Sequence, residues 1–256
     1  MYDRSIKLIA FYSVMIVTLL ITLIGNRSHA LASGVFTVCH EETSYPPYIY
    51  TSKGIASGLL VDIISQSAKL SSIKLNLYSS SWLRCQKDVQ SGRADALFAM
   101  VKTPEREQRY QFPTTQPDLY FLWQAQYPVF YEIGIGFDAK NYIPNKGLAA
   151  PLGYVVTEKL KNKNWLSPYT YKPNEGLAMV AIKKLDGYVV ERLIGTELLK
   201  QLELSSKVKA SDTSLLNTNW YIPFNREFYK ANKHMVELFW RNIATVREKQ
   251  HVLSSQ

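Results

Sequence analysis

The sequence predicts an α/β protein built from two units, and three observations support this prediction. Between residues 35 and 100, segments with the two-residue period of a strand alternate with segments of helical period. After residue 120, an extended aromatic stretch leads into short segments that glycine and proline interrupt. About 225 residues follow an apolar N-terminal segment, which is enough for one large domain or two small lobes.

The first unit begins with a predicted strand from Val35 to Cys39. A turn follows at Tyr45-Pro46-Pro47-Tyr48, and we expect this turn to be exposed. Apolar residues at helical spacing predict a helix over residues 58–70. Residues 73–77 alternate between apolar and polar, which predicts a half-buried strand.

The pattern then repeats. Trp82, Cys85 and Val89 return to helical spacing, and Ser91-Gly92 supplies a stop signal for that helix. Residues 94–100 form an apolar run broken only by Asp95, which predicts one continuous parallel strand buried on both faces.

The second unit has weaker signals. Apolar residues at helical spacing predict a helix over residues 176–185, and residues 187–190 read as a strand that ends at Glu191. Ile222 lies in another strand-like piece, and a long final helix is predicted over residues 228–249. The residues of that helix expected to face inward are Phe228, Ala231, Met235, Leu238, Phe239, Ile243 and Val246.

Residues 1–32 read as a secretory signal peptide. Asp3, Arg4 and Lys7 precede an uncharged apolar run, and small-residue sites for a peptidase lie near Ala30 and Ala32. The alternative is an uncleaved membrane anchor, because the run is nearly as long as the roughly 20 residues that span a bilayer. A cleaved signal places the mature chain in the periplasm.

The basic residues are scattered along the chain. The formal net charge is +9, from 30 Lys and Arg against 21 Asp and Glu. A nucleic-acid-binding surface normally gathers such residues in one stripe with interleaved aromatics, and this sequence has no such stripe. We therefore expect a solvated basic surface and no nucleic-acid partner.

The chain has two cysteines, Cys39 and Cys85, and both lie in the exported portion. Oxidising conditions let such thiols pair, so we predict one disulfide; the alternative is two buried thiols packed as small hydrophobes. His40 is adjacent to Cys39, but the sequence has no CxxC motif and no second histidine nearby. We expect no metal and no cofactor.

A set of short motifs in a fixed order resembles the bacterial extracellular solute-binding proteins of family 3, the periplasmic amino-acid-binding proteins. Each motif is weak alone, but their order and spacing together are specific, and they cover nearly the whole mature chain. In chain order they are Tyr45-Pro46-Pro47-Tyr48, Gly58-Leu59-Leu60-Val61-Asp62, Trp82, Ser91-Gly92-Arg93-Ala94-Asp95-Ala96, Thr103-Pro104-Glu105-Arg106, Phe112 and Leu185-Asp186-Gly187-Tyr188-Val189-Val190-Glu191.

The resemblance implies a two-lobed periplasmic-binding-protein-like fold, in which two α/β lobes are joined by two hinge strands. On this basis we assign residues 33–124 and 216–256 to lobe 1 and residues 125–215 to lobe 2. The ligand is expected in the cleft between the lobes.

The resemblance also implies where a ligand carboxylate binds. Arg106 matches the arginine with which this family grips the ligand α-carboxylate, and Thr103 of the same motif is expected in the ligand site. A planar guanidinium fork suits this role because it can meet both carboxylate oxygens at once. The alternative is a surface arginine at the start of a helix, paired with Glu105 or Glu107.

Two glutamates are candidates for the cationic parts of the ligand. Glu191 matches the position where the family commonly has an aspartate that binds the α-ammonium; the alternative is an acid favoured by a helix N-terminus. Glu42 lies where the first strand leads into the cleft, a position at which the family often has an acid that contacts the ligand side chain. Its neighbour Glu41 is expected to point the other way.

Tyr45 and Trp82 match family positions whose aromatic rings sandwich the ligand side chain. Such walls exclude water and strengthen the polar contacts inside them. For Trp82 the alternative is ordinary core packing.

The sequence departs from the family pattern at two places. The family has a hydroxyl residue two or three positions before the threonine of its Thr-x-Glu-Arg motif, and here Met100, Val101 and Lys102 precede Thr103. In the second lobe, Gly153-Tyr154 replaces a Gly-Thr or Gly-Ser helix start. A helix N-terminus there can still attract an anion through its free N–H groups, with a phenol as the hydroxyl donor.

The function implied is capture of a small polar ligand, an amino acid or related carboxylate, by a monomer that delivers it to the permease of an ABC-type importer. The alternatives are a sensory or orphan binding protein without transport and, less favoured, a dehydratase-like enzyme on the same fold. The sequence has no GxSxG, no HExxH and no phosphate-binding glycine-rich loop, so we expect binding without catalysis.

Overall fold

A computed structural model describes residues 34–52 and 54–254, and the predicted signal peptide lies outside these residues. The first lobe is built on a three-stranded parallel sheet with the order β4-β1-β5. Its strands are β1 (Gly34–Glu41), β4 (Ile73–Ser80) and β5 (Ala96–Leu97). Val38 of β1 pairs with Leu77 of β4 on one side and with Ala96 of β5 on the other. The predicted strand, helix, strand alternation is therefore present.

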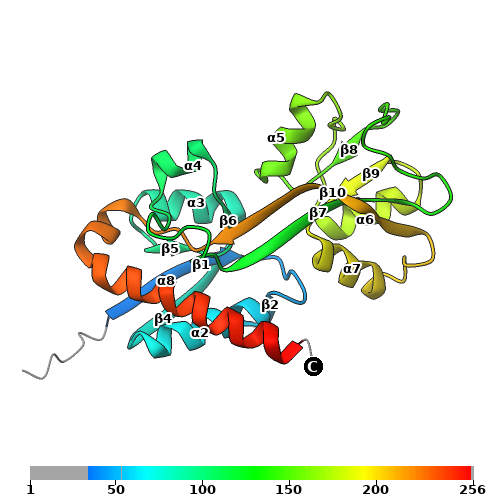
Figure 1. The fold of residues 1–256 in the computed structure, drawn as a ribbon. Coiled ribbons are helices and arrows are strands. Elements are labelled where there is room, and N and C mark those ends of the chain that lie inside the picture. Colours follow the sequence, from blue (N-terminus) through cyan, green and yellow to red (C-terminus); the bar gives the residue numbers. More distant parts are fainter. Residues whose placement is uncertain (1–33, 53, 255–256) are drawn as a thin grey trace, which may run out of the picture. The chain divides into compact units, whose positions relative to one another are not determined.

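Helices cover this sheet. Helix α2 (Leu59–Leu70) and helix α8 (Arg226–Ser254) pack against each other, so residues from both ends of the chain build one lobe (Figure 1). Helix α3 (Trp82–Gln90) packs on β1, and the short helix α4 (Pro104–Arg109) follows. A small hairpin, β2 (Tyr50–Ser52) with β3 (Ile55–Ser57), lies next to α2.

The predicted continuous strand over residues 94–100 is wrong. Two short strands replace it, β5 and β6 (Met100–Val101), and they belong to different sheets. Ala99 between them has φ of +62°, so the chain turns there and β6 pairs antiparallel with β10 instead of extending β5. An apolar run sets burial, but it does not show where the backbone bends.

Two long strands connect the lobes. Strands β7 (Trp123–Glu132) and β10 (Val208–Tyr221) pair antiparallel along their length and run from the first lobe to the second (Figure 1). They form the centre of a five-stranded sheet with the order β6-β10-β7-β9-β8. The lobe boundaries that we predict from the sequence, after residues 124 and 215, fall inside these two strands.

The second lobe is smaller. Its strands β8 (Leu148–Ala149) and β9 (Gly187–Val189) pair parallel, and β9 pairs antiparallel with β7. Its helices are α5 (Val155–Asn162), α6 (Pro173–Ala181) and α7 (Arg192–Gln201).

Helix α8 differs from its predicted pattern at its first turns. Ala231 is exposed, and the next residue, Asn232, has non-helical backbone angles that kink the helix. Beyond the kink the buried face is continuous, with Phe239, Trp240 and Ile243 in the core. The helical period shifts at the kink, which is why a straight-helix pattern misplaced Ala231.

The predicted disulfide joins Cys39 to Cys85, with a Cα–Cα distance of 5.4 Å. It ties the end of β1 to the middle of α3, so two elements that carry candidate site residues are covalently linked. Among the described residues, no cluster of His, Cys, Asp and Glu could hold a metal ion, and no helix is long and apolar enough to cross a membrane.

Candidate functional site

A pocket lies between the lobes, next to the paired strands β7 and β10. The first lobe contributes the end of β1, the start of α3, the β5–β6 segment and α4, and the second lobe contributes the starts of α5 and α7. Its cavity volume is about 60 Å³, which is space for roughly four to six water-sized groups. The pocket therefore suits a small solute.

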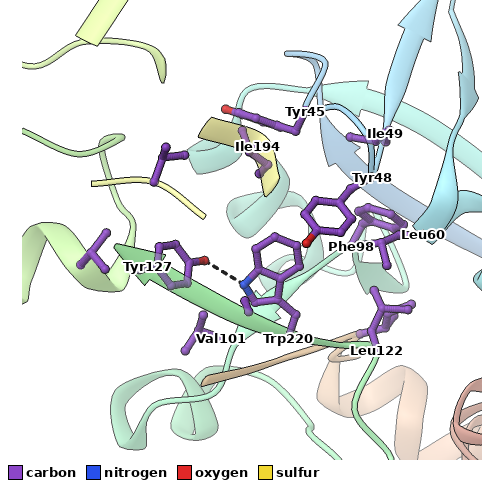
Figure 2. Close-up of a cluster of buried hydrophobic side chains, with 14 of the residues drawn as sticks. Tyr45, Tyr48, Ile49, Leu60, Phe98, Val101, Leu122, Tyr127, Ile194 and Trp220 are labelled. Atoms are coloured by element: carbon purple, nitrogen blue, oxygen red, sulfur yellow. Dashed lines mark hydrogen bonds between the residues drawn. The ribbon is translucent and has the colours of Figure 1, made fainter. Parts of the chain in front are cut away.

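The floor of the pocket is aromatic. The indole N–H of Trp220 on β10 donates to the hydroxyl of Tyr127 on β7, at 2.8 Å (Figure 2). The ring of Tyr48 packs edge-on against Trp220, with ring centroids 5.2 Å apart. These three side chains pack together where the paired strands β7 and β10 pass the site.

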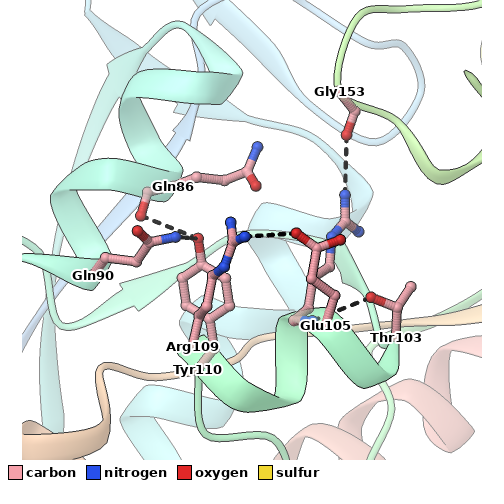
Figure 3. A network of polar contacts seen from close by, with 8 residues as sticks. Gln86, Gln90, Thr103, Glu105, Arg109, Tyr110 and Gly153 are labelled. Atoms are coloured by element: carbon pink, nitrogen blue, oxygen red, sulfur yellow. Dashed lines mark hydrogen bonds and ion pairs between the residues drawn. The ribbon is translucent and has the colours of Figure 1, made fainter. Parts of the chain in front are cut away.

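Arg106 on α4 reaches the pocket and bridges the lobes. Its Nη1 donates to the carbonyl of Val101 at 2.9 Å, and its Nη2 donates to the carbonyl of Gly153 at 3.0 Å. Figure 3 shows the hydrogen bond that the Gly153 carbonyl accepts. Burial lowers the pKa of Arg106, although nearby tyrosines and Glu105 oppose this shift. The alternative of an arginine paired with Glu105 or Glu107 is not what the structure has, because these acids pair with Arg109 and Lys102.

Thr103 does not line the pocket. It is the N-cap of α4, and its hydroxyl oxygen accepts a hydrogen bond from the backbone N–H of Arg106 at 3.2 Å. Pro104 follows at the first helical position, where the missing N–H is not needed. Thr103 thus fixes the start of the helix from which Arg106 projects.

Glu41, at the end of β1, also lines the pocket. One of its oxygens accepts from the hydroxyl of Tyr45 at 2.8 Å, and the other accepts from the hydroxyl of Tyr154, in the second lobe, at 3.0 Å. Burial raises the pKa of Glu41, and the two phenols partly offset that shift.

The expectation that Glu41 points away from the cleft is wrong. Side chains alternate along a strand, so Glu41 shares a face of β1 with Cys39, whose disulfide partner is on α3. Trp82 begins α3, and this face of β1 therefore looks toward the pocket. Glu42 is exposed and lines a wider, outer pocket.

The outer pocket adjoins the first one and has a cavity volume of about 310 Å³. The two pockets share three residues, Glu41, Tyr45 and Trp82. Glu42, Glu175 and Lys172 add further charges to the outer pocket alone.

The segment Gly153-Tyr154 connects the second lobe to both charged groups. The Gly153 carbonyl accepts from Trp82 Nε1 at 3.3 Å as well as from Arg106. Gly153 has φ of +77°, and a Cβ there would lie 3.0 Å from Leu83 and 3.3 Å from Trp82, so only glycine fits without strain. Tyr154 is the N-cap residue of α5, and its phenol points to Glu41.

Trp82 and Tyr45 form walls of the pocket. The Trp82 ring centroid lies 5.8 Å from the Arg106 guanidinium carbon and 5.9 Å from the Tyr154 ring centroid. Tyr45 is buried, as are Pro46 and Tyr48, so the expected exposure of this turn is wrong. The turn packs inward because its aromatic rings cover the pocket.

Glu191 is placed differently from Glu41. It is the N-cap of α7, where one carboxylate oxygen accepts from the backbone N–H groups of Leu193 and Ile194 at 2.8 and 3.2 Å. Only 3% of its surface is exposed, and burial raises its pKa to about 7. Glu191 does not line the pocket, whereas Tyr48 and Tyr127 do; burial is the main cause that raises the pKa of these two tyrosines, and the charge of Glu191 adds to it.

The comparisons with known proteins agree with this architecture. Residues 36–250 match the family described as bacterial extracellular solute-binding proteins, family 3. The chain belongs to this family. Among curated proteins, none matches the sequence.

Solved structures of other proteins superpose on most of the chain. The arginine-, lysine-, histidine-binding protein ArtJ from Geobacillus stearothermophilus has a TM-score of 0.70 at 14% identity, over 86% of this chain and 94% of that chain. A histidine kinase sensor domain similar to periplasmic binding proteins has a TM-score of 0.66 at 15% identity, over 87% and 94%. The ancestral amino-acid-binding protein AncCDT-1, a precursor of cyclohexadienyl dehydratase, has a TM-score of 0.65 at 17% identity, over 87% and 92%. At these identities the likeness establishes the two-lobed fold.

Besides Glu41, sequence reasoning missed most of the other residues that line the pocket, and three of them pack together at its floor. Tyr48, Tyr127 and Trp220 all line the pocket, and two of them come from the connecting strands. Tyr48 was within the Tyr-Pro-Pro-Tyr motif, so the motif itself could have indicated it. Tyr127 and Trp220 could be found only by recognising that β7 and β10 pair with each other and pass the pocket.

Proposed function

We propose that this family member captures a small zwitterionic solute, of the amino-acid kind, in the pocket between its lobes. Arg106 would bind the carboxylate of the solute and Glu41 its cationic nitrogen. The aromatic walls would exclude water from both contacts and strengthen them.

The observation that carries this proposal is a pair of separated charges on one pocket. Among residues 34–52 and 54–254, no ion pair within 4.0 Å involves Arg106 or Glu41. Both groups are largely buried, and their neutral hydrogen-bond partners offset only part of the cost of removing a charge from water. A solute with an anion and a cation would complement both charges at once.

Closure of the lobes is the mechanism we propose for capture. Gly153 and Tyr154 of the second lobe already bond to Trp82, Arg106 and Glu41 of the first lobe. A solute that contacts both lobes would favour the closed arrangement, because only that arrangement offers all its contacts.

A thermal-shift screen tests the proposal. Zwitterions, simple amines and simple carboxylates of similar size would be added to the pure protein, and a solute that binds only the folded state raises the melting temperature by mass action. We expect the zwitterions to give the largest increase and the Arg106→Ala and Glu41→Gln variants to lose it. Equal shifts from an amine, a carboxylate and a zwitterion would contradict the proposal.

Delivery of the solute to the permease of an ABC-type importer, by a periplasmic monomer, is the role we propose downstream of binding. The family assignment supports it. Uptake of labelled solute into membrane vesicles with the importer should require the protein.

A sensory role is the second candidate function. It is supported by the similarity of the fold to that of a histidine kinase sensor domain. Solute binding without any uptake in the vesicle assay would support this role over transport.

We further propose that the protein binds its solute without chemical change. Glu41 faces two phenols and no second carboxylate of the described chain hydrogen-bonds with it, whereas acid–base catalysis across a cleft needs two groups placed on the reacting atoms. Mass spectrometry of candidate solutes after incubation should return them intact, and a product would overturn this part of the proposal.

A further inference from the structure

We infer that the solute carries its carboxylate and its ammonium at opposite ends of a methylene chain, as ω-amino acids do, and that the pocket selects against α-amino acids. This inference rests on the proposed function. It adds that the separation of Arg106 and Glu41 sets the distance between the carboxylate and the ammonium of the solute. Three independent features of the site support it.

The first feature is that Arg106 and Glu41 are anchored at opposite ends of Tyr154. Arg106 bonds to the carbonyl of Gly153, which is joined to the backbone nitrogen of Tyr154. Glu41 bonds to the phenol oxygen, at the far end of the Tyr154 side chain. The two charges are not within ion-pair distance of each other. An α-amino acid holds its charges on adjacent carbons, so it is poorly suited to two partners held apart in this way.

The second feature is the depth of the two charges in the cleft. Arg106 lines the inner pocket alone, whereas Glu41 lines both the inner and the outer pocket. A carboxylate on Arg106 therefore lies inside, and a nitrogen on Glu41 lies at the boundary with the outer pocket. The solute has to extend from one to the other.

The third feature is the apolar surface near Arg106. The apolar residues Phe98, Ala99 and Val101 line the pocket, and Val101 is in direct contact with Arg106. The carbonyls of Val101 and Gly153 already accept from Arg106. An α-ammonium placed next to the bound carboxylate would thus lose its hydration without gaining an acid, which is costly.

Glu191, the acid that the sequence suggested for an α-ammonium, does not supply this partner. It does not line the pocket, and its Oε2 caps helix α7. The Trp82 ring, in contrast, lines the pocket and lies next to both Arg106 and Tyr154, so a methylene chain that joins the two charges would pass along it.

Constitutional isomers test the inference because they have the same atoms and differ only in charge spacing. Calorimetric titration of the full chain would compare γ-aminobutyrate with α-aminobutyrate, δ-aminovalerate with norvaline, and ε-aminocaproate with norleucine. We expect the ω isomer of at least one pair to bind about tenfold more tightly than its α isomer, with one optimal chain length.

Variants assign that preference to Glu41. Glu41→Gln should weaken binding of the ω-amino acid with the highest affinity by about tenfold. The same variant should change binding of a carboxylate that lacks the amine, such as valerate, by no more than about twofold. Glu105→Gln removes an acid that is next to Arg106 in sequence and ion-paired with Arg109 at the surface, and it should leave both affinities unchanged. Circular dichroism would verify that each variant is folded.

The inference and the proposed function fail in different ways. If the α isomers bind as tightly as the ω isomers or more tightly, and Arg106→Ala weakens them, the charge spacing is wrong and the zwitterion pocket stands. If no ω-amino acid binds, the inference is overturned. If, in addition, no zwitterion depends on Arg106, the proposed function falls with it.

Discussion

Strands β1 and β9 each lead to a glutamate at their C-terminal end, yet the two glutamates have different surroundings. Glu41 ends β1 in the first lobe, Glu191 follows β9 in the second, and burial raises the pKa of both. The carboxylate of Glu41 accepts from two phenols and lines the pocket, whereas that of Glu191 lies outside the pocket lining and accepts from the backbone N–H groups at the start of α7, with the phenol of Tyr48 as a further neighbour. Burial of an acid therefore does not identify a binding residue; the contacts of its oxygens do.

The largest expected effect is on Arg106, the cationic counterpart of Glu41. Arg106→Ala should weaken binding of a zwitterion by about 2 to 5 kcal/mol, because a buried charge of the solute would lose its partner. Calorimetry measures this loss. Arg106→Lys keeps the charge without the planar fork and should recover only part of it. A loss of a few tenths of a kcal/mol for Arg106→Ala would remove Arg106 from the site.

The first lobe differs from the second in having a disulfide, which joins β1 to α3 two residues before Glu41. Replacing Cys39 and Cys85 by alanine should lower the free energy of unfolding by about 2 to 4 kcal/mol, since the disulfide closes a loop across a sequence separation of 46 residues. Urea unfolding of the oxidised protein and of the double variant measures the difference. If the double variant were as stable as the native protein, the disulfide would not stabilise this lobe.

The pH dependence of stability should report the burial of Glu191. Glu191 has a pKa of about 7 in the folded protein, above its ordinary value of 4.5, so the folded state binds this proton more tightly than the unfolded state. Its contribution is fully present below about pH 4.5 and is lost as the pH rises through 7. Glu191→Gln should remove up to about 3 kcal/mol of this pH dependence.

Unfolding free energies at several pH values between 4.5 and 8 measure that contribution. Glu197→Gln, on the same helix but partly exposed, is the matched control and should keep the native profile. An unchanged profile in Glu191→Gln would mean that Glu191 titrates in its ordinary range.

The smallest expected effect is on Tyr154, whose phenol links Glu41 to the second lobe. Tyr154→Phe removes one hydrogen bond and keeps the ring packed on Trp82, so binding of a zwitterion should weaken by about 0.5 to 1.5 kcal/mol. Tyr45→Phe is the matched control, because it removes the other hydroxyl that donates to Glu41, and this hydroxyl belongs to the same lobe as Glu41. If Tyr45→Phe alone weakened binding, the bond between the lobes would not contribute.

Most of the fold could be predicted from the sequence because its signals are local. Helix α2 and strand β4 have clear periods, and the pairing of Cys39 with Cys85 follows from their number and their place in the exported portion. The long strands β7 and β10 have no such local pattern, since they pass from one lobe to the other and their surroundings change along their length. Their burial is set by contacts that are distant in sequence.

The candidate site was predictable in part, for the same reason. Motif order placed Arg106, Tyr45 and Trp82 on the pocket, but it assigned the acid to Glu42 and the neighbouring Glu41 to the opposite face. Side chains alternate along β1, so Glu41 lies on the same face as Cys39. The disulfide of Cys39 with α3 then shows that this face looks toward the pocket. Glu191 was placed by similarity, and its capping of α7 depends on side-chain geometry that a motif does not contain.

The most direct test of this account is a calorimetric comparison of Glu41→Gln with Glu191→Gln, using the zwitterion that gives the largest melting shift in the screen. We expect Glu41→Gln to weaken its binding by about tenfold, or about 1.4 kcal/mol, and Glu191→Gln to change it by less than about 0.5 kcal/mol. A large loss in Glu191→Gln together with native affinity in Glu41→Gln would contradict the account, because the cation of the solute would then bind on the second lobe.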